Sequence, residues 1–196
     1  MKRTWLGHST FLLETDAGAK LVTDPVDAGS GFDLPKIEAD VITVSHRHFD
    51  HCATERIGGY PVIKETVDPE TIAGFSIKGY RTFHDEVQGA KRGPNTVFSI
   101  EADGQRIVHC GDLGHIPDDA TIEALKGADV LLIPVGGIYT VDGATAWALT
   151  KRLAPKVVVP MHFAVPELRF HLESVQNFLD AANADPAPIR IEVPER

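Results

Sequence analysis

Four side chains of metal-binding type lie within six consecutive residues of this sequence. Three imidazoles and one carboxylate occur in the segment Ser45-His46-Arg47-His48-Phe49-Asp50-His51. Imidazole nitrogen and carboxylate oxygen suit zinc, manganese or iron, and four such groups this close together would repel one another or lie idle without a cation. A solvated polar loop is the other interpretation, but three further residues of the same chemical types weigh against it.

Those three residues each follow an apolar segment of the chain. His84 follows residues 81–83, Asp112 follows 107–111, and His162 follows 157–161. If these segments are strands whose carboxyl ends share one edge, all seven groups converge there. A lone histidine near a strand is more often a hydrogen-bonded structural residue, and His109 is interpreted in that way. The prediction of a metal site therefore depends on the whole set.

The elements that must position these residues are mostly strands. Segments rich in Val, Ile, Thr and Phe, bounded by Gly, Pro or Asp, predict strands at 4–6, 9–14, 20–23, 41–45, 61–64, 75–83, 96–101, 105–110, 130–135, 156–160 and 189–193. Helices are predicted at 118–126, at 142–153 with Asp142 as its cap, and at 167–182. We therefore expect two packed sheets flanked by helices, in one domain spanning residues 1–196.

The order of the seven residues resembles the metallo-β-lactamase superfamily. The mark of that superfamily is an H-x-H-x-D-H loop followed by single His, Asp and His ligands, an order present here from His46 to His162. Residues 5–11, 111–114 and 159–163 are similar to a branch that contains small Zn-dependent hydrolases and ascorbate-phosphate lactonases. The resemblance covers nearly the whole chain and implies an α/β (α+β) fold, the four-layer αββα sandwich of this superfamily.

The resemblance also implies two divalent metal ions, with zinc expected first and manganese second. The first ion would be held by His46, His48 and His84, the second by Asp50, His51 and His162, and Asp112 would bridge them. Metal binding lowers the pKa of water from about 16 to about 7, so a bridging hydroxide would be the nucleophile. Asp50 and Asp112 are the catalytic candidates, because Asp50 would orient this water or move its proton. The expected reaction is hydrolysis of an ester, lactone or phosphoester in a small molecule.

Four further residues are candidates for contacts with the substrate. His8 lies in the Gly7-His8-Ser9 turn, which the resemblance places beside the metal centre. Lys91 and Arg92 lie in a glycine-containing loop after His84, where they would clamp a carboxylate or phosphate, although a solvated basic loop explains them equally well. Tyr139 follows the apolar segment 130–135 and is expected to form a pocket wall or to donate to an oxyanion.

Composition limits the partners of the protein. The chain is 43% hydrophobic and 24% charged, as in ordinary globular proteins. A net charge of -9 makes nucleic acid an unlikely partner, since nonspecific binding to it needs clustered Lys and Arg. The first residues lack the apolar run of a signal peptide, and no segment approaches the roughly 20 apolar residues of a membrane span. We expect a cytoplasmic protein without membrane association, for which a homo-oligomer is compatible with the sequence.

Iron-dependent redox chemistry is the alternative function. The same fold hosts di-iron oxygen reductases, which typically have Glu at the position of His48, and single-iron sulfur dioxygenases, whose ligand loop can look the same. A mononuclear iron oxidoreductase therefore stays open. RNA processing is disfavoured because the chain has neither spare length nor a basic surface, and the complete ligand set argues against a non-catalytic metal-binding scaffold.

Overall fold

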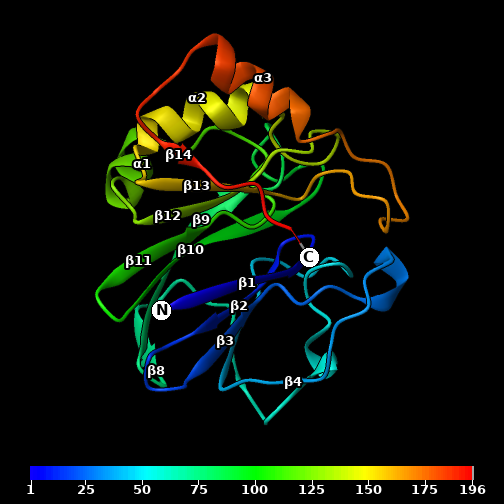
Figure 1. Cartoon of the computed structure of the whole chain (residues 1–196), viewed down its shortest axis with the longest axis vertical. Helices are drawn as coiled ribbons and strands as arrows, with labels where there is room; N and C mark the ends of the chain where they lie inside the picture. The colour runs from blue at the N-terminus through cyan, green and yellow to red at the C-terminus, as the bar shows by residue number, and fades with distance from the viewer. Residues whose placement is uncertain (196) are drawn as a thin grey trace.

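Two β-sheets packed face to face form the centre of the computed structural model, which describes residues 1–195 (Figure 1). The five-stranded sheet contains, in spatial order, β1 (Lys2–Gly7), β2 (Thr10–Glu14), β3 (Lys20–Thr23), β5 (Val41–Thr43) and β7 (Val62–Lys64). The seven-stranded sheet contains β14 (Arg190–Ile191), β13 (Val157–Met161), β12 (Val130–Pro134), β11 (Gln105–His109), β10 (Pro94–Ala102), β9 (Phe75–Phe83) and β8 (Glu70–Ile72). A two-stranded ribbon pairs β4 (Ile37–Glu38) with β6 (Ile57–Gly58).

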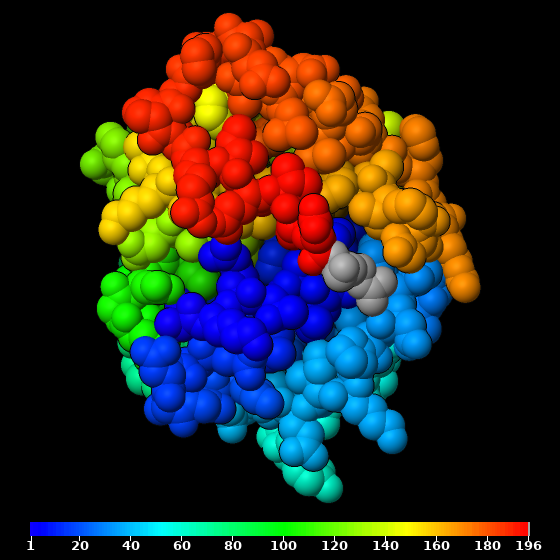
Figure 2. Space-filling model, in the orientation of Figure 1, coloured from blue at the N-terminus to red at the C-terminus, as the bar shows by residue number. Residues whose placement is uncertain are grey.

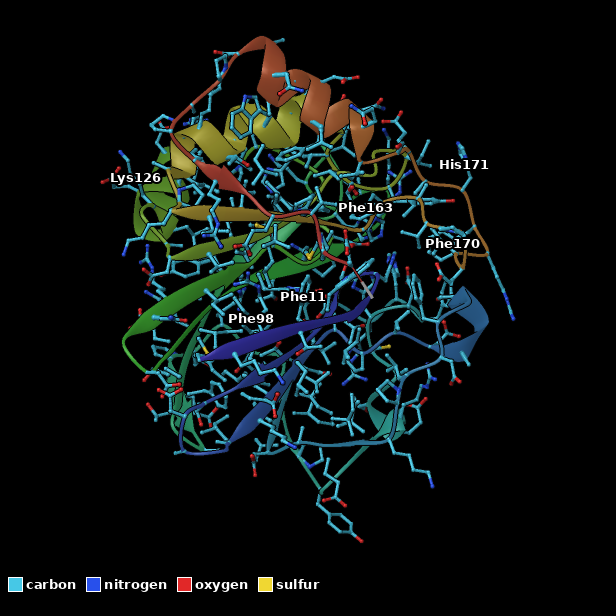
Figure 3. All side chains as sticks on the ribbon, viewed as in Figure 1. Phe11, Phe98, Lys126, Phe163, Phe170 and His171 are labelled. Carbon is cyan, nitrogen blue, oxygen red and sulfur yellow. The ribbon has the colours of Figure 1, made fainter. Side chains whose placement is uncertain are left out.

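Alternation along the strands of the five-stranded sheet divides its side chains between two faces. Phe11 and Leu21 point into the core between the sheets, where Phe98 of β10 also lies (Figure 3). Residues that point to the opposite face of the same sheet, including Val22 and Ile42, belong to a smaller cluster on its outer side. Both faces of this sheet are therefore covered, which explains why its central strands are apolar without interruption.

Three α-helices lie over the outer face of the seven-stranded sheet (Figure 1). They are α1 (Asp119–Leu125), α2 (Gly143–Leu153) and α3 (Gln176–Ala184). The predicted cap Asp142 accepts a hydrogen bond from the backbone N–H of Thr145 at 2.8 Å. The α3 helix packs on α2 through Phe178, whose ring meets Trp147 edge-on. The mixed arrangement of sheets and flanking helices agrees with the prediction.

The outer face of the five-stranded sheet is covered differently. Among the described residues, the β4–β6 ribbon packs on the cluster at this face together with Leu34 and Cys52 from neighbouring loops, and the connections also contain the short 3-10 helices η1 (Ala28–Ser30) and η2 (Thr54–Arg56). Ile57, from β6, packs in the outer cluster with the strand residues. Short segments are sufficient here because the cluster that they cover is small.

The helix predicted at 167–182 is wrong over its first half. The backbone N–H of Arg169 donates to the carbonyl of Ser30 at 3.0 Å, and that of Glu173 donates to the carbonyl of Gly136 at 2.8 Å. These partners are distant in the sequence, so the segment is a tertiary loop and the helix begins only at Gln176. The apolar spacing that suggested a helix comes partly from Leu172, which is buried from within this loop.

The N-terminal strand and the described part of the C-terminal segment lie on the same face of the molecule. Figure 2 shows the C-terminal segment against the N-terminal strand, and the Arg3 guanidinium lies 2.5 Å from the Glu192 carboxylate. The pairing of β14 with β13 brings the C-terminal segment to this position. Among residues 1–195, none of the helices combines the length and the apolar character needed to cross a membrane.

Candidate metal centre

The carboxyl ends of several strands meet at one edge of the sandwich. In the five-stranded sheet β3 and β5 are parallel, and in the other sheet β11, β12 and β13 are parallel. The β9 strand runs in the direction of β11, because both are antiparallel to β10. The residues that follow these strands therefore lie close together, as expected from the sequence. The structure brings all seven predicted ligands to this edge: His46, His48, Asp50, His51, His84, Asp112 and His162.

A first cluster contains the imidazoles of His46, His48 and His84, whose ligand atoms all lie within 4.8 Å of one another. Nδ1 of His84 lies 3.0 Å from the carbonyl oxygen of Tyr139, and Nδ1 of His46 lies 2.9 Å from the hydroxyl of Ser45. A carbonyl only accepts, so Nδ1 of His84 donates this hydrogen bond, and a neutral His84 ring has its lone pair on Nε2. In that form Nε2 is the nitrogen that can bind a metal ion.

A second cluster contains Asp50, His51 and His162 together with His8, and their ligand atoms also lie within 4.8 Å of one another. All four residues are buried. Nε2 of His8 lies 3.1 Å from a carboxylate oxygen of Asp50, and the rings of His8 and His162 have centroids 4.2 Å apart. His8, expected only beside the centre, is thus part of the second group of ligand atoms.

The carboxylate of Asp112 lies between the two clusters. One of its oxygens is 3.0 Å from Nε2 of His84 and 3.2 Å from Nε2 of His162, while the other is 3.2 Å from Nε2 of His51. The side chain thus reaches both groups at once. This is the geometry that a carboxylate shared between two cations requires.

Several buried polar atoms at this edge have no hydrogen-bond partner among the described residues. They are Nδ1 of His8, Nε2 of His46, Nε2 of His51, Oδ1 of Asp112 and Nδ1 of His162. Leaving a buried donor or acceptor unsatisfied costs roughly 1–3 kcal/mol, so a group of five needs a compensating partner. Nitrogen and carboxylate-oxygen donors are the ligands that zinc and manganese accept. The residues therefore fit divalent metal ions.

The pKa shifts of His8, His46 and Asp112 favour metal binding. Burial lowers the pKa of His8 to about 4 and, together with the nearby His51, lowers that of His46 to about 3. Burial raises the pKa of Asp112, but His162 and His51 outweigh it and hold that pKa well below its usual range. At neutral pH the imidazoles of His8 and His46 are thus neutral and the carboxylate of Asp112 is ionised, which are the forms that bind metal.

Asp24 is a residue of the site that the sequence prediction missed. Its fully buried carboxylate accepts hydrogen bonds from Nδ1 of His51 at 2.9 Å and from the backbone N–H and hydroxyl of Ser45. Such a partner fixes the ring orientation of a ligand histidine and raises its basicity. One feature of the sequence could have identified Asp24. It directly follows the β3 strand, just as several of the predicted ligands follow the ends of their strands.

Three residues of the site have left-handed backbone conformations. The φ angles are 53° at His8, 37° at Asp24 and 52° at His162. A residue with a side chain pays for this conformation in steric strain, and such residues concentrate at functional sites. The backbone conformation at these three positions is therefore imposed by the contacts of the site and not by the conformational preference of the residues themselves.

A cavity of about 360 Å³ opens beside the metal-ligand residues. It is lined by His48, Phe49, Asp50, His84, Arg92, Asp112, Tyr139, His162 and Phe170. Figure 3 shows Phe170 on the loop before α3, with His171 at the outer edge of the molecule. A second cavity of about 420 Å³, lined in part by Arg47 and Glu65, includes neither Asp50 nor Asp112. The first cavity therefore gives access to both clusters.

The remaining candidate residues separate into two groups. Arg92 and Tyr139 line the cavity, whereas Lys91 does not, because its ammonium group pairs with Glu86 on the surface. His109 is a buried histidine bonded to the carbonyl of Ser9 and the N–H of Gly111, as expected for a structural residue. Phe170 was not anticipated, because its segment was predicted to be helical.

Comparisons with known proteins agree with this geometry. A family model described as the beta-lactamase superfamily domain matches residues 2–162. A UPF0173 metal-dependent hydrolase of Methanoculleus marisnigri is 31% identical over 92% of this chain and 89% of its own length, and one of Pelotomaculum thermopropionicum is 31% identical over 83% and 84%. A crystal structure of a Thermotoga maritima protein of the metallo-β-lactamase superfamily is 38% identical in sequence to this chain. The match covers 91% of this chain and 84% of the Thermotoga chain, with a TM-score of 0.76. These matches confirm the predicted family and fold class: the chain belongs to the beta-lactamase superfamily.

Proposed function

We propose that this protein is a metal-dependent hydrolase that uses two divalent ions, zinc or manganese, to cleave an ester, lactone or phosphoester bond in a small molecule. The observation that carries the proposal is the position of Asp112 between two groups of ligand atoms. The metal-dependent hydrolases of Methanoculleus marisnigri and Pelotomaculum thermopropionicum, which match most of this chain, support the same class of reaction.

Each group of residues has a part in this reaction. His46, His48 and His84 would hold one ion, Asp50, His51 and His162 the other, and Asp112 both. Two ions bound there would supply a hydroxide nucleophile at neutral pH and polarise the bond that is attacked. Asp50, whose carboxylate also faces the cavity, is placed to orient the attacking water and to accept its proton.

Burial of the ligands supports this assignment of roles. Most of the ligand side chains are buried, whereas His48 is partly exposed and lines the cavity. A substrate therefore approaches from the side of His48, Asp50 and Tyr139. The backbone carbonyl of Tyr139 fixes His84, and its ring forms a wall of the cavity.

The proposal also includes the domain organisation, the location and the partners of the protein. We expect residues 1–196 to act as one domain in the cytoplasm on a small-molecule substrate, without nucleic acid or membrane, and a homo-oligomer is compatible with this. The net charge of -9 supports the exclusion of nucleic acid. Oxidation at a single iron is not favoured, because the ligand atoms form two groups and the matched relatives are metal-dependent hydrolases.

A panel of aryl esters, lactones and phosphodiesters, offered to zinc-loaded and manganese-loaded protein, tests the proposal. We expect hydrolysis of one bond class to depend on added metal and to fall at least about 100-fold in Asp50→Asn. His171→Ala, which changes an exposed histidine, is the control and should keep wild-type activity. Hydrolysis that persists unchanged in Asp50→Asn would contradict the role of this carboxylate.

A further inference from the structure

Aromatic rings line the mouth of the cavity next to the metal-ligand residues. The ring of Phe170 has its centroid 6.2 Å from that of Phe49, 6.3 Å from that of Tyr139 and 5.5 Å from that of His8. All these contacts are edge-on or nearly so, an arrangement favoured between aromatic rings. Phe170 is therefore the centre of an aromatic cluster, formed by Phe49, Tyr139 and Phe170, at the entrance to the site.

Part of this aromatic surface faces solvent. Phe49 is 60% exposed and Tyr139 is 38% exposed. Single exposed apolar residues are common, but these rings adjoin one another around a cavity rather than being scattered. A contiguous apolar surface at the mouth of a cavity is typical of a surface that an apolar ligand covers.

The loop that carries Phe170 is fixed in place. On either side of Phe170, the backbone N–H groups of Arg169 and Glu173 donate to carbonyls of Ser30 and Gly136, and Leu172 is buried. The ring is therefore held at the cavity mouth by its neighbours and costs little further ordering when a ligand binds.

One cation lies at the edge of the same cavity. The Arg92 guanidinium lies over the ring of Tyr139, 5.4 Å from its centroid, and one of its nitrogens donates to the carbonyl of Ile138 at 3.1 Å. A guanidinium has five N–H donors, so others stay available to an anion. Arg92 is the one Lys or Arg residue that lines this cavity among the described residues.

The position of Arg92 is set by a buried carboxylate. Asp85 accepts hydrogen bonds from the backbone N–H groups of Val87, Gly89, Lys91 and Arg92, at 2.7 to 2.9 Å. The loop of residues 87–92 is therefore held around the Asp85 carboxylate by hydrogen bonds, and it is not a flexible basic segment. Its neighbour Lys91 is turned away toward Glu86, so the loop presents one cation to the cavity.

We propose that the substrates of this site are small anions that carry a flat apolar group, with the anionic group bound by Arg92 and the apolar group packed on Phe170 and Phe49. This inference rests on the proposed hydrolase function and names its substrate class. Arg92 supplies a positive charge at the edge of the cavity, although the protein as a whole is negative.

Three sulfonyl compounds separate the two parts of the proposal without requiring turnover. The compound 4-toluenesulfonate has both the charge and the ring, methyl 4-tolyl sulfone has nearly the same shape without the charge, and methanesulfonate has the charge without the ring. A sulfonate is a weak metal ligand, which limits direct binding to the ions. NMR titration of zinc-loaded protein should show 4-toluenesulfonate binding at least about tenfold more tightly than either of the others.

Matched variants identify the residues responsible. Arg92→Gln should reduce the affinity for 4-toluenesulfonate to that of the neutral sulfone, whereas Lys91→Gln, which removes the same charge one residue away, should leave it unchanged. Phe170→Ala should lower the affinity for 4-toluenesulfonate about tenfold and leave that for methanesulfonate unaltered, and Phe170→Leu should recover part of the loss. Thermal unfolding of each variant confirms that it is folded.

The outcomes distinguish this inference from the proposed function. Equal affinities for the three compounds, or tight binding that survives Arg92→Gln, would overturn the substrate class even if hydrolysis is observed. Conversely, a protein that hydrolyses no ester, lactone or phosphoester but binds 4-toluenesulfonate as described would contradict the proposed reaction and leave the binding site in place.

Discussion

The carboxylate of Asp24 accepts a hydrogen bond from Nδ1 of His51 at 2.9 Å, in a position where both side chains are fully buried. This contact fixes Nε2 of His51 toward Asp112, from which it is 3.2 Å away. The orientation of one ligand thus depends on a residue that does not itself reach the cavity. The first prediction follows from this pair.

Asp24→Asn should lower the affinity of the protein for zinc by roughly 10- to 100-fold, because His51 loses the charged partner that orients it and raises its basicity. Competition with a fluorescent chelator measures this affinity. Asp40→Asn is the matched control, since Asp40 is an exposed carboxylate that accepts one backbone N–H. Equal affinities in the wild type and Asp24→Asn would remove this role from Asp24.

Zinc binding should release a proton at neutral pH. Burial lowers the pKa of His51, but the carboxylates of Asp112, Asp50 and Asp24 outweigh burial and raise this pKa well above its usual value. The metal-free protein therefore carries a protonated His51 that a metal must deprotonate, and zinc affinity should rise as the pH rises toward that pKa. Calorimetry in buffers of different ionisation enthalpy measures the proton, and heats that do not depend on the buffer would contradict the prediction.

The stability of the metal-free protein should show the opposite pH dependence. Because the pKa of His51 is raised by folding, its contribution is fully present below the unfolded value of about 6.5 and is lost as the pH rises through the folded pKa. The melting temperature of metal-free protein should therefore fall above neutral pH more than that of zinc-loaded protein. Parallel curves for the two forms would count against a protonated His51.

Asp112→Ala should lower metal content and reduce hydrolysis by at least about 100-fold while the sheets stay folded. The reason is that its carboxylate lies within 3.0 to 3.2 Å of histidines from both clusters. Asp119→Ala, at an exposed position in α1, is the control. Full activity with normal metal content in Asp112→Ala would exclude the bridging role.

His8→Ala should weaken the binding of one metal ion by about tenfold or more and affect the other less. Its Nε2 lies 3.1 Å from Asp50 and its Nδ1 is one of the buried atoms without a partner. A zinc titration of the variant should therefore show two separated steps. If both steps coincide with those of the wild type, His8 neither binds a metal nor holds Asp50.

The loop that presents Arg92 should open when Asp85 is changed. Burial raises the pKa of Asp85, but the backbone N–H groups of Arg92, Gly89, Lys91 and Val87 lower it to about 2. The contribution of this carboxylate is present above an unfolded pKa of about 4 and is lost as the pH falls toward 2. In Asp85→Asn, amide hydrogen exchange at Lys91 and Arg92 should rise about tenfold at neutral pH, whereas unchanged protection would show that other contacts close the loop.

Much of the strand pattern follows from the sequence. The β3 and β9 strands begin and end at the predicted residues. In β9 buried and exposed side chains alternate, which is a local property of a strand, whereas β3 is a short apolar strand that is covered on both faces. The predicted carboxyl ends of the strands also indicated the edge of the sheets at which the candidate metal ligands lie together. The short β4, β6 and β8 strands were not predicted, since their two or three residues lack the adjacent Val and Ile residues that mark the equally short β5 and β7.

What could not be predicted depends on contacts between distant parts of the chain. The loop before α3 has an apolar spacing that also fits a helix, and only its hydrogen bonds to Ser30 and Gly136 decide between them. The same contacts place Phe170 at the cavity. Arg92 and Lys91 are adjacent in sequence, and only the closure of their loop on Asp85 shows which of them faces the site. Asp24 was missed because one aspartate after a strand is common.

Metal content per chain is the most direct test of the two-metal site. Elemental mass spectrometry should be applied to protein purified without chelator or metal-affinity resin and then supplemented with zinc or manganese. About two zinc or manganese ions per chain, falling in Asp112→Ala, are predicted. A single iron per chain would favour oxidation chemistry instead, and no bound metal after supplementation would contradict both functions.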